Sequence, residues 1–573
     1  MWQKNLPKNN SAKSCYLAIL VLLVVVWPET AQAQAGGAFE VSLHVDGEYY
    51  GDFFGRSVDF IGDLDGDGLP DIVVGADTAD PGGITSAGSV FVHSSVTGNL
   101  LLRVDGSFAR QWLGWPVAGA GDVNLDGIPD FIAGASGWIE EGFFGAAFVY
   151  SGADGSVIHK LLGNVWFGRA VDGGHDVNGD GYPDLLVGAG LDSILHLYAN
   201  SGSAWVFSGK DGSVLHHYEG THSFMMLGHS VAFGEDYDRD GVSDFLVGAP
   251  GFNTPDLEEA GKVFLYSGAT GELIFAMEGI AETSVFGVDV CSVPDTNQDG
   301  YPEILVGAEL ETIDGYPHVG AAYLCSGRTG EIIFRFEGIP GHGWFGHAVA
   351  CAGDLNGDGI SELLVSVART GGPNLEDGMV RLFSGADGTL LWEHSGNSTG
   401  DIFGEDVAAG EDVTGDGIPD LLVGAPQFGF LQGGPGYVEI LSVDPFLRID
   451  TSSLSVDEGG VATLDIDFPD SEAGYAYAVL ASLTGPGPSR LADLLIPLSQ
   501  DHFYQQMLSG QAPAAFENAY SSLDANGNAS ASYTLPAGTS ATWVGRRLYL
   551  AAISYAPGQP RLSSASVSLR TRP

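Results

Sequence analysis

Basic residues are few in this chain. Lys and Arg number 22 among 573 residues, against 73 Asp and Glu, so the formal net charge is −51. Nucleic acids and anionic membrane surfaces are bound by basic protein surfaces that neutralise phosphate groups. The composition therefore excludes nucleic acid as a partner, and it raises the question of where so many carboxylates lie.

Cysteine is also scarce, with three residues beyond the N-terminal segment: Cys291, Cys325 and Cys351. An odd number of cysteines in so long a chain does not make a disulfide framework. Counted from the repeated Phe-Gly pair described below, Cys291 and Cys351 differ by one residue, so we expect them to face opposite sides of their strands. We therefore expect no structural disulfide.

Long apolar runs are confined to the N-terminus. Residues 16–27 form an apolar run of 12, preceded by three lysines and followed by Ala-Gln-Ala at 31–33. This order is typical of an export signal, and the run is too short to cross a bilayer, which takes roughly 20 residues. We predict a signal peptide over 1–33, a mature chain without a membrane span, and a secreted or cell-surface location. The alternative is a buried N-terminal helix.

Sustained helical spacing is absent from residues 39–443, where one pattern recurs seven times at steps of 54 to 60 residues. Each copy has Phe or Leu followed by Gly, a pair that we call the marker. Eight residues after the marker glycine, an Asp opens an acidic loop. The markers are Phe54-Gly55, Leu113-Gly114, Phe167-Gly168, Leu227-Gly228, Phe286-Gly287, Phe345-Gly346 and Phe403-Gly404.

Each copy reads as four short antiparallel strands. A small and apolar run follows the marker, a second run follows the acidic loop, and a turn such as Ser-Gly-Ala-Thr-Gly separates the third run from the fourth. Seven such units predict an all-β, seven-bladed β-propeller over 39–445. The seventh unit lacks a fourth strand, and residues 39–47 resemble one, so we expect the N-terminal strand to close the ring.

The acidic loops repeat one arrangement of oxygen-bearing side chains at loop positions 1, 3, 5 and 9. Position 6 is always glycine, and position 7 offers its backbone carbonyl. The four side chains and the position 7 residue are Asp63, Asp65, Asp67, Asp71 and Leu69; Asp122, Asn124, Asp126, Asp130 and Ile128; Asp176, Asn178, Asp180, Asp184 and Tyr182; Asp236, Asp238, Asp240, Asp244 and Val242; Asp295, Asn297, Asp299, Glu303 and Tyr301; Asp354, Asn356, Asp358, Glu362 and Ile360; and Asp412, Thr414, Asp416, Asp420 and Ile418.

Ligand sets made only of oxygen select a hard cation, and alternate loop positions converge on it when the loop wraps around. The EF-hand begins in the same way but closes with an acid at position 12, which is apolar here. We therefore predict up to seven Ca²⁺ sites in short loops between strands. The alternative is that Asp, Asn and Gly are turn residues, but their fixed register in seven copies favours metal binding.

The marker, the acidic loop and the Gly-Ala-Pro that follows the fourth and seventh loops resemble the FG-GAP repeat of integrin alpha chains. The resemblance covers residues 39 to about 443. It implies the propeller fold, and calcium bound by positions 1, 3, 5, 7 and 9 of the loops between the first and second strands. No transmembrane segment, leg domain or inserted adhesion domain is recognisable, so the chain looks more like secreted bacterial FG-GAP proteins than like an integrin.

Residues 446–573 differ in kind, because the acidic loops stop and short alternating runs replace them. We predict a small β-sandwich-like domain with an irregular or partly helical insertion near 500–520. Residues 524–528 imitate an acidic loop, but Ser532 stands at position 9, so we interpret the segment as a hairpin turn.

These features favour an extracellular binding, adhesion or scaffold module that acts on an unknown protein or glycan. Successive connections of an antiparallel meander alternate between the two rims, an alternation that we call strand parity. It places the acidic loops on one rim and the variable loops on the other. The second rim also carries the aromatic residues Tyr49, Tyr50, Phe108, Trp112, Phe224 and Trp344. The alternative is a calcium-dependent hydrolase or lyase acting on extracellular polysaccharide. No catalytic motif is recognisable, and His216, His217, His222 and His229 lack zinc spacing. We predict no enzyme, no catalytic residue and no organic cofactor.

Overall fold

The computed structural model describes residues 35–573, apart from 37, 140–142, 193–198, 370–376, 399, 428–433, 445, 450, 452, 469–471, 485–487, 492–493, 557–558 and 565–566. The predicted signal peptide, 1–33, lies outside the described residues. Within the described part of the chain, no helix combines the length and the apolar character that crossing a membrane requires.

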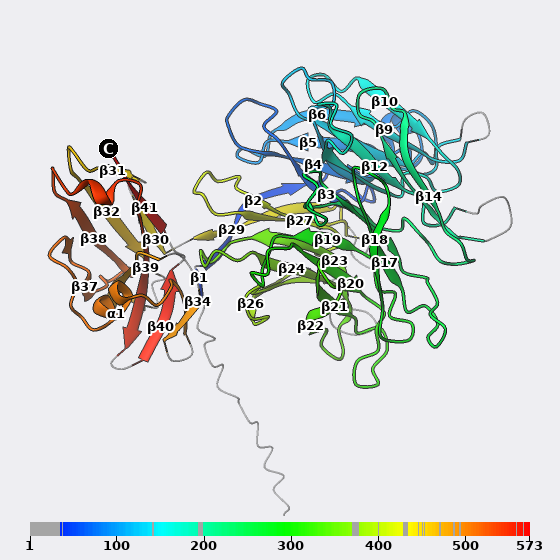
Figure 1. The fold of residues 1–573 in the computed structure, drawn as a ribbon. Helices are drawn as coiled ribbons and strands as arrows, with labels where there is room; N and C mark the ends of the chain where they lie inside the picture. Colours follow the sequence, from blue (N-terminus) through cyan, green and yellow to red (C-terminus); the bar gives the residue numbers. More distant parts are fainter. Residues whose placement is uncertain are drawn as a thin grey trace, which may run out of the picture. The chain divides into compact units, whose positions relative to one another are not determined.

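Residues 38–444 form seven consecutive four-stranded antiparallel sheets, which confirms the predicted seven-bladed propeller (Figure 1). Short apolar runs of strand length, separated by Gly- and Asp-rich turns, give each blade this meander. Blades one to three contain β3 (Ser57–Ile61), β4 (Asp71–Ala76), β5 (Ser89–His93) and β6 (Leu100–Asp105); β7 (Leu113–Gly121), β8 (Asp130–Ala135), β9 (Ala146–Tyr150) and β10 (Val157–Leu162); and β11 (Ala170–His175), β12 (Asp184–Gly188), β13 (Ser203–Phe207) and β14 (Val214–Glu219).

Blades four to seven continue the same order. They contain β15 (Val231–Phe233), β16 (Phe245–Ala249), β17 (Lys262–Tyr266) and β18 (Leu273–Glu278); β19 (Val290–Val293), β20 (Glu303–Ala308), β21 (Ala321–Ser326) and β22 (Ile332–Glu337); β23 (Gly343–Gly353), β24 (Glu362–Arg369), β25 (Met379–Phe383) and β26 (Leu390–Ser395); and β27 (Val407–Glu411), β28 (Asp420–Ala425), β29 (Tyr437–Asp444) and β2 (Ala38–Asp46).

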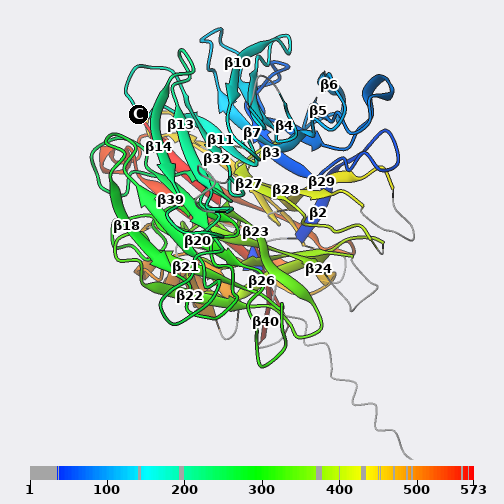
Figure 2. The same ribbon diagram turned by 90° about the vertical axis from the view of Figure 1, so that its right-hand side faces the viewer.

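The N-terminal strand closes the ring, as predicted. β2 pairs antiparallel with β29, with Phe39 opposite Val443, and so supplies the missing fourth strand of blade seven. β2 and β29 lie side by side in both views (Figures 1 and 2). The innermost strands contact one another in the order β3, β7, β11, β15, β19, β23, β27 and back to β3. The ring is therefore closed by strand pairing as well as by packing.

The markers join neighbouring blades. Their Phe and Leu side chains are all buried, as expected for core residues. In six blades, the marker Phe or Leu also forms a bridge to a glycine at the start of the preceding blade's third strand, as Phe345 does to Gly320. The marker glycines adopt positive φ, and a side chain on Gly346 would clash with the carbonyl oxygen of Ala321. Glycine is therefore required where two blades touch through their backbones.

Four aspartates on the innermost strands or directly before them add a second link between blades, which was not predicted from the sequence. Each accepts a backbone N–H of another blade: Asp59 from Gly119 at 2.8 Å, Asp172 from Phe233 at 2.6 Å, Asp289 from Val349 at 2.8 Å, and Asp406 from Val58 at 3.0 Å. Their other oxygens accept the N–H of the following residue on their own strand. The carboxylates thus act as hydrogen-bonding bridges across four of the seven blade junctions.

The rest of the described chain forms two main sheets around one separate hydrophobic core. One sheet holds β1 (Ala35–Gly36), β31 (Ser453–Ser455), β33 (Ala476–Ser482), β37 (Tyr520–Ser522), β39 (Arg547–Ala556), β40 (Gln559–Ser564) and β41 (Val567–Arg572). The other holds β30 (Leu447–Ile449), β32 (Gly460–Asp467), β36 (Phe516–Glu517) and β38 (Asn528–Leu535), and β34 (Pro488–Leu491) pairs with β35 (Leu494–Pro497). Helix α1 (His502–Leu508) lies inside the predicted insertion. The domain limits 39–445 and 446–573 remain predictions.

We predict that Gly346→Ala destabilises the propeller by at least about 2 kcal/mol, because the new methyl group meets a backbone carbonyl at positive φ. Gly341→Ala is the matched control, since Gly341 also has positive φ but no atom lies within 4 Å of the place its methyl group would take. The midpoint of urea unfolding, followed by tryptophan fluorescence, measures both. Equal losses in the two variants would show that the marker contact is not tight.

Candidate metal centres and the central pocket

All seven acidic loops fold into the same turn. The position 1 aspartate accepts the N–H of the position 6 glycine, as in Asp63 with Gly68 at 2.8 Å. The position 5 aspartate accepts the N–H of position 7, as in Asp67 with Leu69 at 2.9 Å. Both hydrogen bonds recur in every loop. These bonds explain the constant spacing as a turn, and they leave further carboxylate lone pairs for another partner.

Position 3 separates the seventh loop from the others. In the first six loops, its side-chain oxygen accepts the N–H of position 5, as Asn124 does from Asp126 at 2.8 Å. In the seventh loop, the hydroxyl of Thr414 donates instead to Asp412 at 3.4 Å. The seventh loop therefore lacks one carboxylate or amide acceptor that the others present.

The position 9 carboxylates are buried at the first residue of the second strand or next to it. Each accepts the N–H of position 2, as Asp130 does from Val123 at 2.8 Å. The other oxygen of Asp130 accepts the N–H of Gly152, in the turn between the third and fourth strands. This bond places the acidic loop and that turn on the same rim, as strand parity predicts. Burial raises the pKa of Asp130 to about 6.

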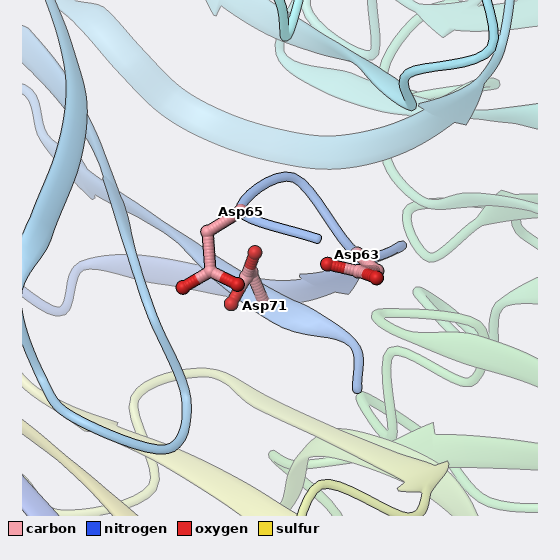
Figure 3. A group of neighbouring side chains, drawn as sticks. All are labelled: Asp63, Asp65 and Asp71. Carbon is pink, nitrogen blue, oxygen red and sulfur yellow. The ribbon is translucent and has the colours of Figure 1, made fainter. Parts of the chain in front are cut away.

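Three loops bring three carboxylates together in the described part of the chain. Ligand-capable oxygens lie within 4.8 Å of one another in each of these groups: Asp63, Asp65 and Asp71; Asp236, Asp238 and Asp244; and Asp295, Asp299 and Glu303. Figure 3 shows the first group, with Asp63 and Asp65 on the loop and Asp71 on β4. The second, third, sixth and seventh loops, all within the described residues, keep the turn but do not gather three carboxylates this closely.

The sixth loop holds an oxygen that lacks a partner. Asp358, at position 5, is 2% exposed, and its Oδ2 accepts no hydrogen bond from the described residues. Burial and the nearby Asp354 raise its pKa to about 7. A buried carboxylate oxygen without a donor is costly, and a cation held by the loop would satisfy it. The donor set and this oxygen therefore fit a hard divalent cation.

The opposite rim opens into a central pocket of about 970 Å³. The residue directly after each marker glycine lines it in all seven blades: Arg56, Trp115, Arg169, His229, Val288, His347 and Glu405. We call these seven residues the channel ring. They were not predicted from the sequence, although their fixed place after an unvarying glycine was the signal that could have found them.

Two arginines of the channel ring enclose one tryptophan. The guanidinium carbon of Arg56 lies 3.9 Å from the centroid of the Trp115 ring, and that of Arg169 lies 3.2 Å from it. Arg56 also pairs with Glu405 at 3.5 Å. Arg169 lies 5.6 Å from the centroid of Trp166 and has no carboxylate within ion-pair distance among the described residues. Burial and the nearby Arg56 lower the pKa of Arg169 to about 9.

His347 holds the other side of the channel ring together. Its Nδ1 lies 2.5 Å from Glu309, and its Nε2 lies 3.7 Å from Glu405. Burial alone would lower its pKa, but the hydrogen bond to Glu309 and the charges of Glu309, Glu405 and Asp289 raise it to about 9. His229, by contrast, has its pKa lowered to about 4, first by burial and then by Arg169. At neutral pH, His347 is therefore a cation and His229 is neutral.

The rim aromatics predicted from the sequence have different environments. Tyr49, Tyr50 and Phe224 are exposed. Trp112 stacks on Trp166 at 5.8 Å, Phe108 packs on Trp138 at 4.6 Å, and Trp344 lines the pocket. Phe53, Trp112, Trp166, Met226, Val285, Trp344 and Ile402, which precede the seven markers, all have positive φ. Such a backbone is strained for large side chains, so the blade junction imposes it.

The histidines near blade four have different environments. His216 lies 3.1 Å from the carbonyl of Gly268, His217 stacks on Trp205 at 3.4 Å, and His229 belongs to the channel ring. The three described cysteines are free. Cys291 and Cys351 nevertheless pack against the same hydrophobic cluster, because neighbouring blades present opposite faces to each other.

We predict that Asp358→Asn stabilises the metal-free protein by about 1–3 kcal/mol, because the variant removes a buried charge whose Oδ2 accepts no hydrogen bond from the described residues. Asp67→Asn is the matched control, since Asp67 holds the same loop position but is exposed. Urea unfolding in chelator at pH 8 measures both. In calcium the advantage of the variant should disappear. A gain that persists in calcium would show that the sixth loop holds no cation.

We predict that His347 contributes stability that is complete below pH 6.5 and is lost as the pH rises through about 9. The sign follows because a histidine whose folded pKa is raised binds its proton more tightly in the folded state. The measurement is the difference in unfolding free energy between the wild type and His347→Gln from pH 6 to 10. A difference that does not change with pH would mean that His347 is not paired with Glu309.

The FG-GAP repeat model matches residues 54–93, 167–207, 227–266, 286–325 and 403–441, which are blades one, three, four, five and seven. The chain is 33% identical over 232 residues to integrin alpha pat-2 of Caenorhabditis elegans, which is 36% of this chain and 18% of that protein. It is 36% identical over 216 residues to integrin alpha-5 of Xenopus laevis, 35% of this chain and 20% of that protein.

Integrin alpha-8 of Mus musculus is 28% identical over 302 residues, 49% of this chain and 27% of that protein. The chain therefore spans about a fifth to a quarter of the length of these relatives. With seven blades, buried markers and acidic loops in register, the chain contains FG-GAP repeats in an integrin-alpha-like β-propeller.

Proposed function

We propose that this protein is a secreted calcium-binding β-propeller of the bacterial FG-GAP type that serves as an extracellular binding, adhesion or scaffold module. One observation carries the proposal: the acidic loops occupy one rim, and the central pocket with its aromatic surroundings opens at the other. A rigid scaffold that separates a stabilising rim from a rim of variable loops is suited to recognition.

The calcium part of the proposal rests on the donor chemistry. The loops offer carboxylate, amide and carbonyl oxygens without sulfur or imidazole, which favours a hard cation. Three loops gather three carboxylates, and the sixth holds a buried oxygen that lacks a partner among the described residues. Up to seven ions would reduce the repulsion within a chain whose formal charge is −51.

The binding part of the proposal rests on the variable rim. Tyr49, Tyr50 and Phe224 are exposed there, and Trp344 lines the pocket. Exposed rings beside a concavity are common anchors for a partner, whether protein or glycan. Similarity to integrin alpha chains supports an extracellular setting, and the predicted signal peptide over 1–33 supports secretion.

Removal of calcium should lower the melting temperature of the purified protein. Folded loops hold the ion, whereas unfolded loops do not converge their carboxylates, and each site at a hundredfold excess of free ion over Kd contributes up to about 2.7 kcal/mol. Calorimetry with and without chelator measures the effect, and elemental analysis establishes the metal content. An unchanged melting curve after complete removal of calcium would contradict the calcium proposal.

Capture of extracellular proteins and glycans on arrays in millimolar calcium tests the binding proposal. We predict that Trp344→Ala weakens capture by about 2 kcal/mol or more while the melting temperature changes little, because a pocket aromatic serves a ligand. Trp112→Ala is the comparison, since its ring is stacked on Trp166. A loss of stability in step with affinity would make Trp344 structural. Turnover of an extracellular polysaccharide would favour the enzyme alternative.

A further inference from the structure

The channel ring differs from the rest of this acidic protein in its charge. It collects Arg56, Arg169 and the cationic His347 in one pocket, although the whole chain has 22 Lys and Arg. The guanidinium carbons of Arg56 and Arg169 both lie over the Trp115 ring. A cation–π contact of this kind does not use the N–H groups of a guanidinium, which remain available for hydrogen bonds.

Arg169 leaves hydrogen-bonding capacity unused in this pocket. Among the described residues, its buried Nη1 has no hydrogen-bond partner, and no carboxylate lies within ion-pair distance of the guanidinium. A guanidinium carries five N–H donors, and a buried donor without an acceptor costs free energy. At this point of the pocket, Arg169 therefore lacks a hydrogen-bond acceptor among the described residues.

The carboxylates that line the pocket already have donors. Asp59, Asp172, Asp289 and Asp406 each accept two backbone N–H groups. Glu309 faces His347, and Glu405 lies between Arg56 and His347. The lining carboxylates therefore have donors of their own, although the charge of Glu405 also acts on Arg169.

Asp77 is a nearby acid with an unused oxygen. It follows β4, is 5% exposed, and has an Oδ1 without a hydrogen-bond partner among the described residues. It is not among the residues that line the pocket, whereas Arg169 is. Burial raises its pKa to about 6, although Arg56 and Arg169 act against the rise. Asp77 is therefore a counter-charge behind the channel ring.

We propose that the channel ring binds one carboxylate group of a protein partner, with the guanidinium edge of Arg169 as its main ligand. A carboxylate matches the fork of a guanidinium with two parallel hydrogen bonds. The pocket of about 970 Å³ accommodates the group together with the peptide that carries it. This inference rests on the proposed binding function and deepens it by naming the chemical group that the pocket receives.

The surrounding charge selects a single carboxylate over other anions. A phosphate monoester carries nearly two negative charges and would face Glu309 and Glu405, which line the same pocket. A polyanionic polysaccharide would also meet the field of a chain with a formal charge of −51. An acidic side chain or a C-terminal carboxylate on an otherwise neutral or basic protein carries one charge and lessens both penalties.

The test uses small carboxylates as probes of the full-length protein in calcium. N-acetylglycine represents a chain terminus, and the α-amide of N-acetylaspartate represents an acidic side chain. N-acetylglycinamide is the neutral control, and inorganic phosphate is the alternative anion. Binding is followed by the indole N–H resonance of Trp115, assigned with Trp115→Phe. We expect saturable shifts with one or both carboxylates, weaker binding of phosphate, and no shift with the amide.

Variants of Arg169 then test whether this residue binds the carboxylate. Arg169→Gln should weaken carboxylate binding at least tenfold, and Arg169→Lys should fall between it and the wild type, because lysine keeps the charge but not the fork. Arg328→Gln is the matched control, since Arg328 is an exposed arginine beside Tyr301, at 5.2 Å, outside the pocket. Asp77→Asn should bind equally or more tightly, because a competing charge is removed.

Several results would overturn the inference. These are the absence of a saturable response to both carboxylates, unchanged affinity in Arg169→Gln, phosphate binding as tight as carboxylate binding, or weaker binding in Asp77→Asn. If Arg169→Gln does not fold, the comparison of Arg169→Lys with Arg328→Gln decides. If the protein binds carboxylates but captures no partner, the adhesion proposal alone is contradicted. If it captures partners but binds no carboxylate, this inference alone is contradicted.

Discussion

The backbone contact between each marker and the preceding blade is the constraint on which the propeller depends. The marker glycine has no room for a side chain, and the residue before the marker is held at positive φ. The residue after the marker consequently enters the central pocket in every blade. Eight residues of extended chain then cover roughly 25 Å and deliver the acidic loop to the other rim. One repeated contact therefore fixes both the channel ring and the candidate metal centres.

Much of this arrangement could be predicted from the sequence because it is periodic. The blade number, the closing role of residues 39–47 and the burial of the marker side chains follow from spacing and apolar pattern. The acidic loops could also be placed, because Asp63 and Gly68 keep their spacing in every copy. The convergence of the carboxylates was harder to predict than the position of the loops, because it depends on side-chain orientation. It differs between loops of almost equal sequence.

The channel ring and the bridging aspartates could not be predicted in the same way. Asp59 and Asp289 do not occupy the same place after their markers, so no repeat pattern reveals that both accept an N–H of the next blade. Cys291 and Cys351 show the same limit. Strand parity alone places them on opposite faces, but two opposite faces of neighbouring blades meet in the ring. Contacts between blades depend on ring geometry, which one unit of the repeat does not contain.

The division between unvarying and varying positions has a physical origin. Loop positions 1 and 5 are fixed because their carboxylates accept backbone N–H groups, and the glycines at position 6 and in the marker are fixed because they adopt positive φ or tolerate no side chain. The side chain of the residue after the marker has neither duty, so this position holds arginine, tryptophan, histidine, valine and glutamate in different blades. The fold places this unconstrained position around a pocket, where a change of side chain alters recognition without opening the ring. The side chains that can vary without disturbing the scaffold therefore gather at the channel ring. Arg169 belongs to this ring, and its Nη1 has no hydrogen-bond acceptor among the described residues.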